Sequence, residues 1–368
     1  MDKKIKVSII SRESDKKTLD IVMLENELKK RGAEVTVLSK LLTKEKSLRN
    51  AAGYIGQVMR QEAAILASDT VVLDTYCIPA SMLPHHKRTK VIQIWHALAA
   101  IKKFGWQTVG MEGGSSEKIA KLMRMHHGYD YVISSSDITA KHFAEAFRVS
   151  PDKIVKQGLP RIDYIKSVSS GERQEDMQKK IYAKYPQLKK NDPTDGKDKK
   201  IVLYAPTFRR GKAVDVSSLA EALDSKKYEL VVKLHPLYRG NNADSDASII
   251  YDEEFSSYDW LSVCDIIISD YSSFVVESTL ADKPLYIYAY DMDEYSRSTG
   301  LNVDYSKEPI APYVFTDAAE LGKAVSEPYD MDALRTFRDR YIDIDTENCT
   351  EKLAEFILSQ AAKKYQKK

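Results

Sequence analysis

The sequence contains few cysteines and no long apolar run, and each absence excludes a class of protein. Its 368 residues include three cysteines, Cys77, Cys264 and Cys349, which show neither metal-site spacing nor the even number of a disulfide framework. No window approaches the roughly 20 consecutive apolar residues of a membrane span. The start, MDKKIKVSII, lacks the apolar core of a signal peptide. These absences predict a cytoplasmic protein with reduced thiols, which reaches a membrane only peripherally.

The signature motifs of several enzyme classes are also missing. Neither a G-x-x-x-x-G-K-[ST] loop nor a G-x-G-x-x-G turn occurs, so ATPase and nicotinamide-dependent functions lose their main support. Because no H-E-x-x-H and no cluster of metal-ligand spacing occurs, we expect no cofactor and no obligatory metal. Lys+Arg 56 against Asp+Glu 54 gives a net charge of +2, so nucleic acid is not expected as a partner.

Apolar strands alternate with helix patterns along the chain, which predicts an α/β protein with parallel sheets. A length of 368 residues suits two domains. Strands are expected at 5–10, 34–38, 70–74, 90–95, 129–134, 200–204, 229–234, 247–251, 266–269 and 285–289. Helices are expected at 18–31, 53–68, 217–224, 273–281 and 332–362, the last with a break near 343–348.

A charged, turn-rich stretch separates two halves of this pattern. We expect an N-terminal Rossmann-like domain at 1–166, a charged connector at 167–199 and a C-terminal Rossmann-like domain at 200–345. A final helix at 346–368 is expected to pack back on the N-terminal domain. With a cleft between two such domains, ligands are expected beyond the carboxyl ends of the strands.

Two histidines stand at such strand ends. His96 directly follows the strand at 90–95, and because imidazole titrates near neutral pH it suits a general base. His235 follows the strand at 229–234 and is held by Pro236, which restricts the exit of the chain. The alternative for each is a purely structural role, as a core histidine or a cap of the strand.

A third strand end carries the sequence APTFR. Ala205, Pro206 and Thr207 turn the chain after the strand at 200–204, and Arg209 follows. The rigid fork of an arginine matches phosphate oxygens, so Thr207 and Arg209 are candidate phosphate ligands. The alternative is a surface turn with a solvated basic residue.

The fourth strand end, SDYSSFVVES, begins a helix with two serines. Ser272 and Ser273 are typical helix N-caps, which is the structural alternative. The same geometry directs backbone N–H groups and the helix dipole at an anion, so a phosphate or pyrophosphate is expected there. Asp270 is expected to position the loop, and Glu277 to accept a hydrogen bond from a ribose.

These pieces, in this order, resemble the CDP-glycerol glycerophosphotransferase family, the TagB/TagF-like enzymes of teichoic acid synthesis. The resemblance covers about residues 71–312. The motifs that carry it are VIQIWHALAAIKKFG, DYVISSSDITAKHFAEAF, GLPRIDY, LYAPTFR, VVKLHPL and DIIISDYSSFVVESTLADKPLYIYAYDMDEY.

The resemblance implies a GT-B fold and transfer of a polyol phosphate from CDP-glycerol or CDP-ribitol, with release of CMP. The acceptor would be a hydroxyl on a lipid-linked saccharide carried by polyprenyl diphosphate, bound on the side of the N-terminal domain. His96 matches the proposed base, and His235 matches the histidine that binds the donor pyrophosphate and stabilises the leaving group. The remaining family positions, expected to bind substrate, are Arg161, Pro206, Thr207, Arg209, Asp270, Ser272, Ser273 and Glu277.

The sequence departs from the family pattern at two places and leaves several questions open. The family often has W-H-G-T-P where this chain has Trp95-His96-Ala97-Leu98-Ala99, and often an aspartate where it has Glu277. Glycerol or ribitol as the polyol, primase or polymerase activity, and homo-oligomer formation are all left open. The alternatives are a GT-B glycosyltransferase that uses a UDP-sugar, the related UDP-sugar 2-epimerase and, from another class, a non-catalytic binding protein.

The stretch SSEKIAKLMRMHHGY is a candidate for contact with the membrane that would carry such an acceptor. At helical spacing Ile119, Leu122 and Met123 share one face, and Lys118 and Lys121 are among the basic residues beside it. A basic amphipathic helix can lie in an anionic interface. The alternative is an ordinary helix that packs on the N-terminal sheet.

Overall fold

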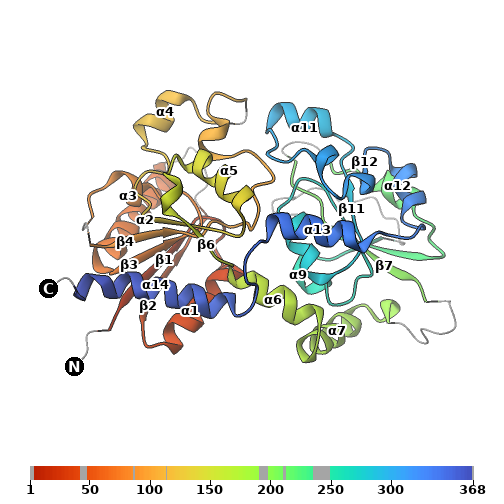
Figure 1. Cartoon of the computed structure of the whole chain (residues 1–368), viewed down its shortest axis with the longest axis horizontal. Helices are drawn as coiled ribbons and strands as arrows, with labels where there is room; N and C mark the ends of the chain where they lie inside the picture. Colours follow the sequence, from red (N-terminus) through yellow and green to blue (C-terminus); the bar gives the residue numbers. More distant parts are fainter. Residues whose placement is uncertain are drawn as a thin grey trace. The chain divides into compact units, whose positions relative to one another are not determined.

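The structure, a computed structural model, divides into two compact units. It describes residues 4–41, 48–85, 88–112, 114–189, 198–209, 213–234 and 249–366. Unit 1 comprises Met1–Asp163 and Tyr341–Lys368, and unit 2 comprises Tyr164–Arg340. Each unit is built on its own parallel sheet (Figure 1).

The sheet of unit 1 has six parallel strands in the order β2-β1-β3-β4-β5-β6. The strands are β1 (Lys6–Ser11), β2 (Glu34–Ser39), β3 (Thr70–Leu73), β4 (Lys90–Gln93), β5 (Tyr131–Ser134) and β6 (Ile154–Lys156). Central β3 is buried along its whole length, whereas edge strands β2 and β6 are partly exposed. A central parallel strand reads as a continuous apolar run because helices cover both of its faces.

The helices of unit 1 surround this sheet, and α1 and α14 lie side by side across it (Figure 1). In α1, Ile21, Leu24 and Leu28 form the buried face, and the helix stops before Gly32, whose φ is +85°. The helices are α1 (Leu19–Lys30), α2 (Leu48–Ala67), α3 (Ile78–Met82), α4 (Glu117–Leu122), α5 (Asp137–Phe147), α6 (Pro160–Ser169, which continues into unit 2) and α14 (Cys349–Gln366), with 3-10 turns η1 (Gly105–Thr108) and η2 (Pro151–Lys153).

The sheet of unit 2 also has six parallel strands, in the order β12-β11-β10-β7-β8-β9. The strands are β7 (Lys200–Tyr204), β8 (Tyr228–Val232), β9 (Ile249–Tyr251), β10 (Ile266–Ser269), β11 (Leu285–Tyr288) and β12 (Val314–Phe315). Their core includes a set of tyrosines, among them Tyr204, Tyr286 and Tyr288, whose rings are nearly fully buried.

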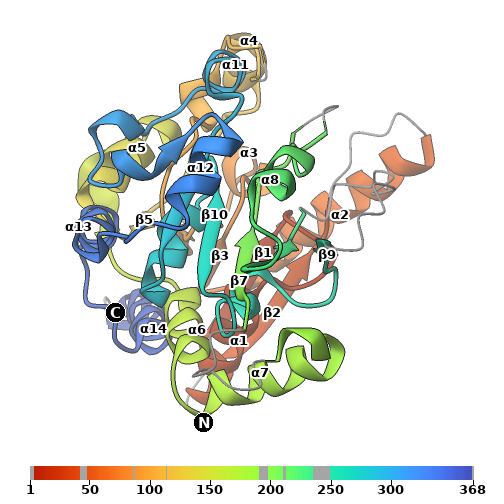
Figure 2. The same cartoon turned by 90° about the vertical axis from the view of Figure 1, so that its right-hand side faces the viewer.

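Short helices cover the sheet of unit 2, and α8 and α12 pack together beside it (Figure 2). These helices are α7 (Glu172–Lys184), α8 (Ser217–Ala222), α9 (Ser257–Trp260), α10 (Phe274–Glu277), α11 (Met292–Ser298), α12 (Ala318–Ala324) and α13 (Met331–Tyr341), with 3-10 turns η3 (Pro186–Leu188), η4 (Ser278–Ala281), η5 (Tyr305–Lys307) and η6 (Ala311–Tyr313).

An aspartate placed just before a strand ties each sheet together at its amino-terminal edge. Asp69, before β3, accepts a hydrogen bond from the Lys6 backbone N–H at 3.0 Å. Asp130 does the same for Val91 at 2.9 Å, and Asp265 for Ile201 at 2.8 Å. Each carboxylate satisfies a backbone donor at the start of the adjacent strand.

The domain limits of the structure differ from those expected. The described part of the expected connector belongs to unit 2, because α7 buries Ile181 and the side-chain amide of Gln178 donates to the Ser262 carbonyl at 2.9 Å. The chain returns to unit 1 at Tyr341, and α14 begins eight residues later, at Cys349, on the carboxylate of Asp163. That carboxylate accepts from the backbone N–H of Thr350 at 2.7 Å.

The expected fold class is confirmed, and most expected elements are present within a few residues. The expected break in the last helix falls between the end of α13 at Tyr341 and the start of α14 at Cys349. The short strands β6 and β12 were not expected. Among the described residues, no helix combines the length and the apolar character needed to cross a membrane.

Candidate active site

Each sheet has one position where the strand order reverses, between β1 and β3 in unit 1 and between β7 and β10 in unit 2. In open α/β sheets ligands bind beyond the carboxyl ends of the strands at this switch point. Asp74 follows β3, and His96 lies after the neighbouring strand β4. In unit 2, Arg209 lies after β7 and Asp270 directly follows β10. Both sets are thus found where the topology predicts a site.

His96 has one ring nitrogen engaged by the backbone of unit 1. Its Nδ1 lies 3.0 Å from the carbonyl oxygen of Asp74. Because a carbonyl oxygen only accepts, Nδ1 carries the proton, and the neutral ring keeps its lone pair on Nε2. The side chain is 34% exposed, and the Glu13 carboxylate lies 3.9 Å from Nδ1. The ring therefore has the tautomer and the access to solvent that a general base needs.

Asp74 places a second ionisable group beside this histidine. Its side chain is buried, and neither carboxylate oxygen has a hydrogen bond of normal geometry from a described residue. Burial raises the pKa of Asp74 to about 7, although hydrogen bonding from the Ser11 and Thr75 side chains lowers this pKa in part. The charge of Glu13 raises it further. Asp74 thus titrates in the range in which a histidine base operates.

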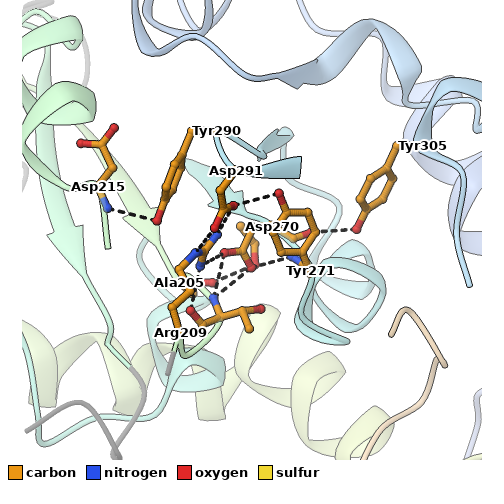
Figure 3. Close-up of polar contacts among 10 residues, drawn as sticks. Ala205, Arg209, Asp215, Asp270, Tyr271, Tyr290, Asp291 and Tyr305 are labelled. Carbon is orange, nitrogen blue, oxygen red and sulfur yellow. Dashed lines mark hydrogen bonds and ion pairs between the residues drawn. The ribbon is translucent and has the colours of Figure 1, made fainter. Parts of the chain in front are cut away.

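Arg209 forms a buried cluster with two carboxylates at the switch point of unit 2 (Figure 3). Its Nη1 donates to Asp270 at 2.7 Å and to the Thr207 carbonyl at 2.8 Å. Its Nε and Nη2 donate to the two oxygens of Asp291, at 2.7 and 2.9 Å. Four of the five guanidinium N–H groups thus have acceptors from unit 2 itself. The fork that we expected to face phosphate is directed at Asp291.

Aromatic rings complete the surroundings of this cluster. The guanidinium carbon lies 4.8 Å from the centroid of Tyr290 and 5.5 Å from that of Tyr271. The Tyr271 hydroxyl donates to Asp291 at 3.0 Å, and the Tyr305 hydroxyl donates to the Asp270 carbonyl at 2.7 Å (Figure 3). Although burial opposes it, hydrogen bonding and charge from Arg209 hold the pKa of Asp291 below its ordinary value. The cluster is a closed ion-pair network with one guanidinium between two carboxylates.

Asp270 also fixes the turn that carries Pro206 and Thr207. The Thr207 backbone N–H donates to both carboxylate oxygens, at 2.9 and 3.0 Å. Pro206 and Thr207 are buried, and the Thr207 hydroxyl has no hydrogen-bond partner among the described residues. A buried, unpartnered hydroxyl is costly unless a ligand or water binds it. Thr207 is therefore a candidate ligand-binding group.

Ser272 and Ser273 lie at the start of α10, half-buried. The Ser272 hydroxyl accepts from the Phe274 backbone N–H at 3.2 Å. The Ser273 hydroxyl donates to Glu277 at 2.8 Å, and the other oxygen of Glu277 accepts from Tyr258 at 2.6 Å. Both oxygens of Glu277 are thus bonded within unit 2, and its expected bond to a ribose stays a prediction.

The remaining expected residues are Arg161 and His235. Arg161, in the first turn of α6, binds the buried Asp20 through its backbone N–H and its Nε, both at 2.8 Å, and through Nη2. This contact joins α6 to α1 within unit 1, so a substrate role for Arg161 stays a prediction. His235 lies outside the described residues, and its expected role likewise stays a prediction.

The sequence reasoning missed Asp74 and Asp291, although the rule that selected the other residues would have found them. Asp74 follows β3 directly, and Asp291 lies three residues after the end of β11. No cluster of three or more His, Cys, Asp or Glu suited to a metal ion occurs in the part of the chain that the structure describes. Burial raises the pKa of Cys77 to about 11.

Comparison with protein families and curated proteins gives a consistent match. A model of the family described as CDP-Glycerol:Poly(glycerophosphate) glycerophosphotransferase matches residues 2–359. The teichoic acid ribitol-phosphate primase of Bacillus spizizenii is 30% identical over 327 residues, which cover 86% of this chain and 81% of that protein. The teichoic acid glycerol-phosphate primase of Bacillus subtilis is 30% identical over 298 residues, covering 79% and 73%.

Solved structures support the fold. The wall teichoic acid polymerase TagF has a TM-score of 0.73 and 20% sequence identity, covering 98% of this chain and 90% of that one. A UDP-GlcNAc 2-epimerase from Neisseria meningitidis has a TM-score of 0.56 and 12% identity, covering 98% and 100%. At these identities the likeness shows the fold, two Rossmann-like domains of the GT-B class.

Proposed function

Because this chain belongs to the CDP-glycerol:poly(glycerophosphate) glycerophosphotransferase family, as its motifs predicted, we propose that it transfers a polyol phosphate in the synthesis of a teichoic acid-type polymer. The donor is CDP-glycerol or CDP-ribitol, and CMP is the leaving group. The acceptor is a hydroxyl of a saccharide carried on polyprenyl diphosphate.

The observation that carries the catalytic part of this proposal is the hydrogen bond between His96 and the Asp74 carbonyl. It supports a neutral ring with the basic lone pair on Nε2, on a side chain that solvent can reach. A general base must have the correct tautomer as well as a suitable pKa. His96 in this state is able to take a proton from an acceptor hydroxyl.

The reaction forms one bond and breaks one. The acceptor oxygen attacks the β-phosphorus of the donor, and its proton passes to Nε2 of His96. The bridging P–O bond breaks, and CMP leaves with the bridging oxygen. Such transfers depend mainly on positioning and on stabilisation of charge at the phosphates.

The donor side of the proposal rests on groups of unit 2. Ser272 and Ser273, with the backbone at the start of α10, bind the pyrophosphate, and the unpartnered Thr207 hydroxyl supplies a further donor. His235 is assigned to the leaving phosphate. Arg209 acts through the loop that it holds, because its charge is already matched by Asp270 and Asp291.

Contact with the membrane is assigned to the surface of α4, which Figure 1 shows at the periphery of unit 1. Ile119 is 55% and Leu122 69% exposed, and Ala120 is the one buried residue of this helix. Lys118 and Lys121 are exposed beside them. Apolar and basic side chains on one exposed surface suit an anionic membrane interface, so we propose a peripheral location on the inner face of the cell membrane.

The proposal is tested by identifying the product. Purified protein is incubated with a short-chain analogue of the lipid-linked acceptor and with CDP-glycerol, CDP-ribitol or UDP-GlcNAc, and the acceptor is analysed by mass spectrometry. A mass gain of one or more polyol phosphates with one CDP donor is expected. A gain of a sugar from UDP-GlcNAc, or no product from any donor with several acceptors, would contradict the proposal.

A further inference from the structure

A buried amide joins the two strand ends that present His96. Gln93, the last residue of β4, is fully buried. Its Oε1 accepts the Trp95 backbone N–H at 2.9 Å, and its Nε2 donates to the Thr75 carbonyl at 3.1 Å. The Gln93 side chain thus binds Trp95, which precedes His96, and Thr75, which follows Asp74. The Asp74 carbonyl in turn binds the His96 ring.

The backbone at Trp95 shows why such support is needed. Its φ is +56°, in the left-handed region that a bulky side chain rarely adopts. Residues persist in such conformations only where their surroundings hold them, and they are concentrated at functional sites. The Gln93 bond fixes the Trp95 N–H, and the indole stacks on Phe104 with ring centroids 4.5 Å apart.

The opposite side of the His96 bond is held by the same amide. Thr75 follows Asp74, and its hydroxyl accepts the Arg12 backbone N–H at 3.0 Å, so it is tied to the end of β1 as well. Because Gln93 fixes the Thr75 carbonyl, the peptide group between Asp74 and Thr75 has little freedom to rotate. The Asp74 carbonyl is consequently aimed at Nδ1 of His96.

We propose that Gln93 is a positioning residue, which acts through His96 by holding the ring in the orientation and the tautomer that leave Nε2 basic. Its catalytic consequence rests on the proposed function, whereas its effect on the ring does not. A glutamine suits this place because its amide combines an acceptor oxygen with a donor NH2 group, and the bonds to Trp95 and Thr75 need both.

The test uses Gln93→Met, which keeps a similar volume and loses both hydrogen bonds. The ring nitrogens of the histidines are labelled with ¹⁵N in the full chain, and the His96 signals are assigned by their loss in His96→Ala. The wild type is expected to show the Nδ1–H tautomer when neutral. Gln93→Met is expected to show a mixture of tautomers. Gln61→Met, which removes another buried glutamine of unit 1, is expected to leave the His96 signals unchanged.

Kinetics supply the second readout. A misplaced catalytic group costs on the order of 10²-fold in rate, so kcat of Gln93→Met should fall by about that factor with the donor KM little changed. In the His96→Ala background the same substitution should cost nothing further, because it acts only through that ring. Gln93→Glu, which keeps the acceptor for Trp95 and loses the donor to Thr75, is used if the methionine variant does not fold.

An unchanged His96 tautomer in a folded Gln93 variant would overturn the proposal. So would a loss of kcat that persists undiminished in the His96→Ala background. If the wild type transfers no polyol phosphate at all, the proposed function fails, while the nitrogen signals still decide the role of Gln93.

Discussion

At the switch point of unit 1, a histidine keeps one ring nitrogen for the backbone and leaves the other basic, and the carboxylate of a buried aspartate beside it has no hydrogen bond of normal geometry from a described residue. At the switch point of unit 2, an arginine has nearly all its donors engaged by two carboxylates and a carbonyl. Both sheets are parallel, have six strands and contain one switch point, and both place ionisable residues at the carboxyl edge. The difference teaches that an ionisable residue at a strand end either is available to react with a substrate or holds the protein structure together. Its bonded partners decide which.

The largest effect is expected from removing Arg209, which holds the ion-pair network of unit 2 together. In Arg209→Ala the buried Asp270 and the partly buried Asp291 lose their counter-charge, and we expect the free energy of unfolding to fall by about 3–5 kcal/mol. Denaturant titration measures the loss. Arg209→Lys should also be destabilised, because a lysine cannot bond both carboxylates as a fork. If Arg209→Lys kept wild-type stability and mainly weakened donor binding, Arg209 would be a phosphate ligand and the comparison would fail.

The matching change in unit 1 should affect rate and leave stability nearly intact. In His96→Ala the reaction loses its base, and kcat should fall by about 10²-fold or more. Because the ring is 34% exposed, its removal should leave the melting temperature close to that of the wild type. The exposed His127, which bonds Arg124, provides a control: His127→Ala should keep full activity. Wild-type turnover by His96→Ala would refute the assignment.

Asp74 should make the stability of the protein depend on pH up to about 7, in contrast to Asp291 of unit 2, whose pKa is lowered. The pKa of Asp74 is raised to about 7 in the folded protein from 3.8. The folded state therefore holds this proton more tightly, and its contribution to stability is full at low pH and is lost as the pH rises towards 7. Between these values the contribution should fall by about 1.4 kcal/mol per pH unit, and in Asp74→Asn it should be absent. Identical pH profiles of unfolding for the two proteins would show that Asp74 does not titrate in this range.

The smallest effect on stability is expected on α4. Because Leu122 is 69% exposed, Leu122→Asn should change the free energy of unfolding by less than about 0.5 kcal/mol. The Leu122→Asn variant should bind anionic vesicles roughly tenfold more weakly than the wild type, because one apolar side chain is no longer buried in the membrane interface. Cosedimentation with vesicles measures this, with the exposed Leu66→Asn on α2 as the matched control. Equal losses in both variants would show that α4 is not the contact surface.

The sequence predicted the parallel sheets because their central strands, such as β10 and β11, are uninterrupted apolar runs buried on both faces. The strands β6 and β12 have three and two residues and are partly exposed, so they carry too little periodicity to be recognised.

The position of the candidate sites could be predicted, but not the state of each residue. His96 and Arg209 were found because they follow strands. The partner of Arg209, Asp291, lies 82 residues further along the chain, and the pairing exists only because β7, β10 and β11 are adjacent in the sheet. The positive φ of Trp95 likewise arises from the tertiary contacts of Gln93 and Phe104, which no local pattern encodes.

The most direct test of the account is acceptor-dependent release of CMP by the purified protein. CDP-glycerol and CDP-ribitol are supplied separately, each with and without a lipid-linked acceptor analogue. The account predicts that one donor yields CMP, that the yield depends on the acceptor and that His96→Ala lowers the rate by about 10²-fold or more. No CMP from either donor, with folded protein and several acceptors, would contradict polyol phosphate transfer and turn attention to UDP-sugars and then to a binding function.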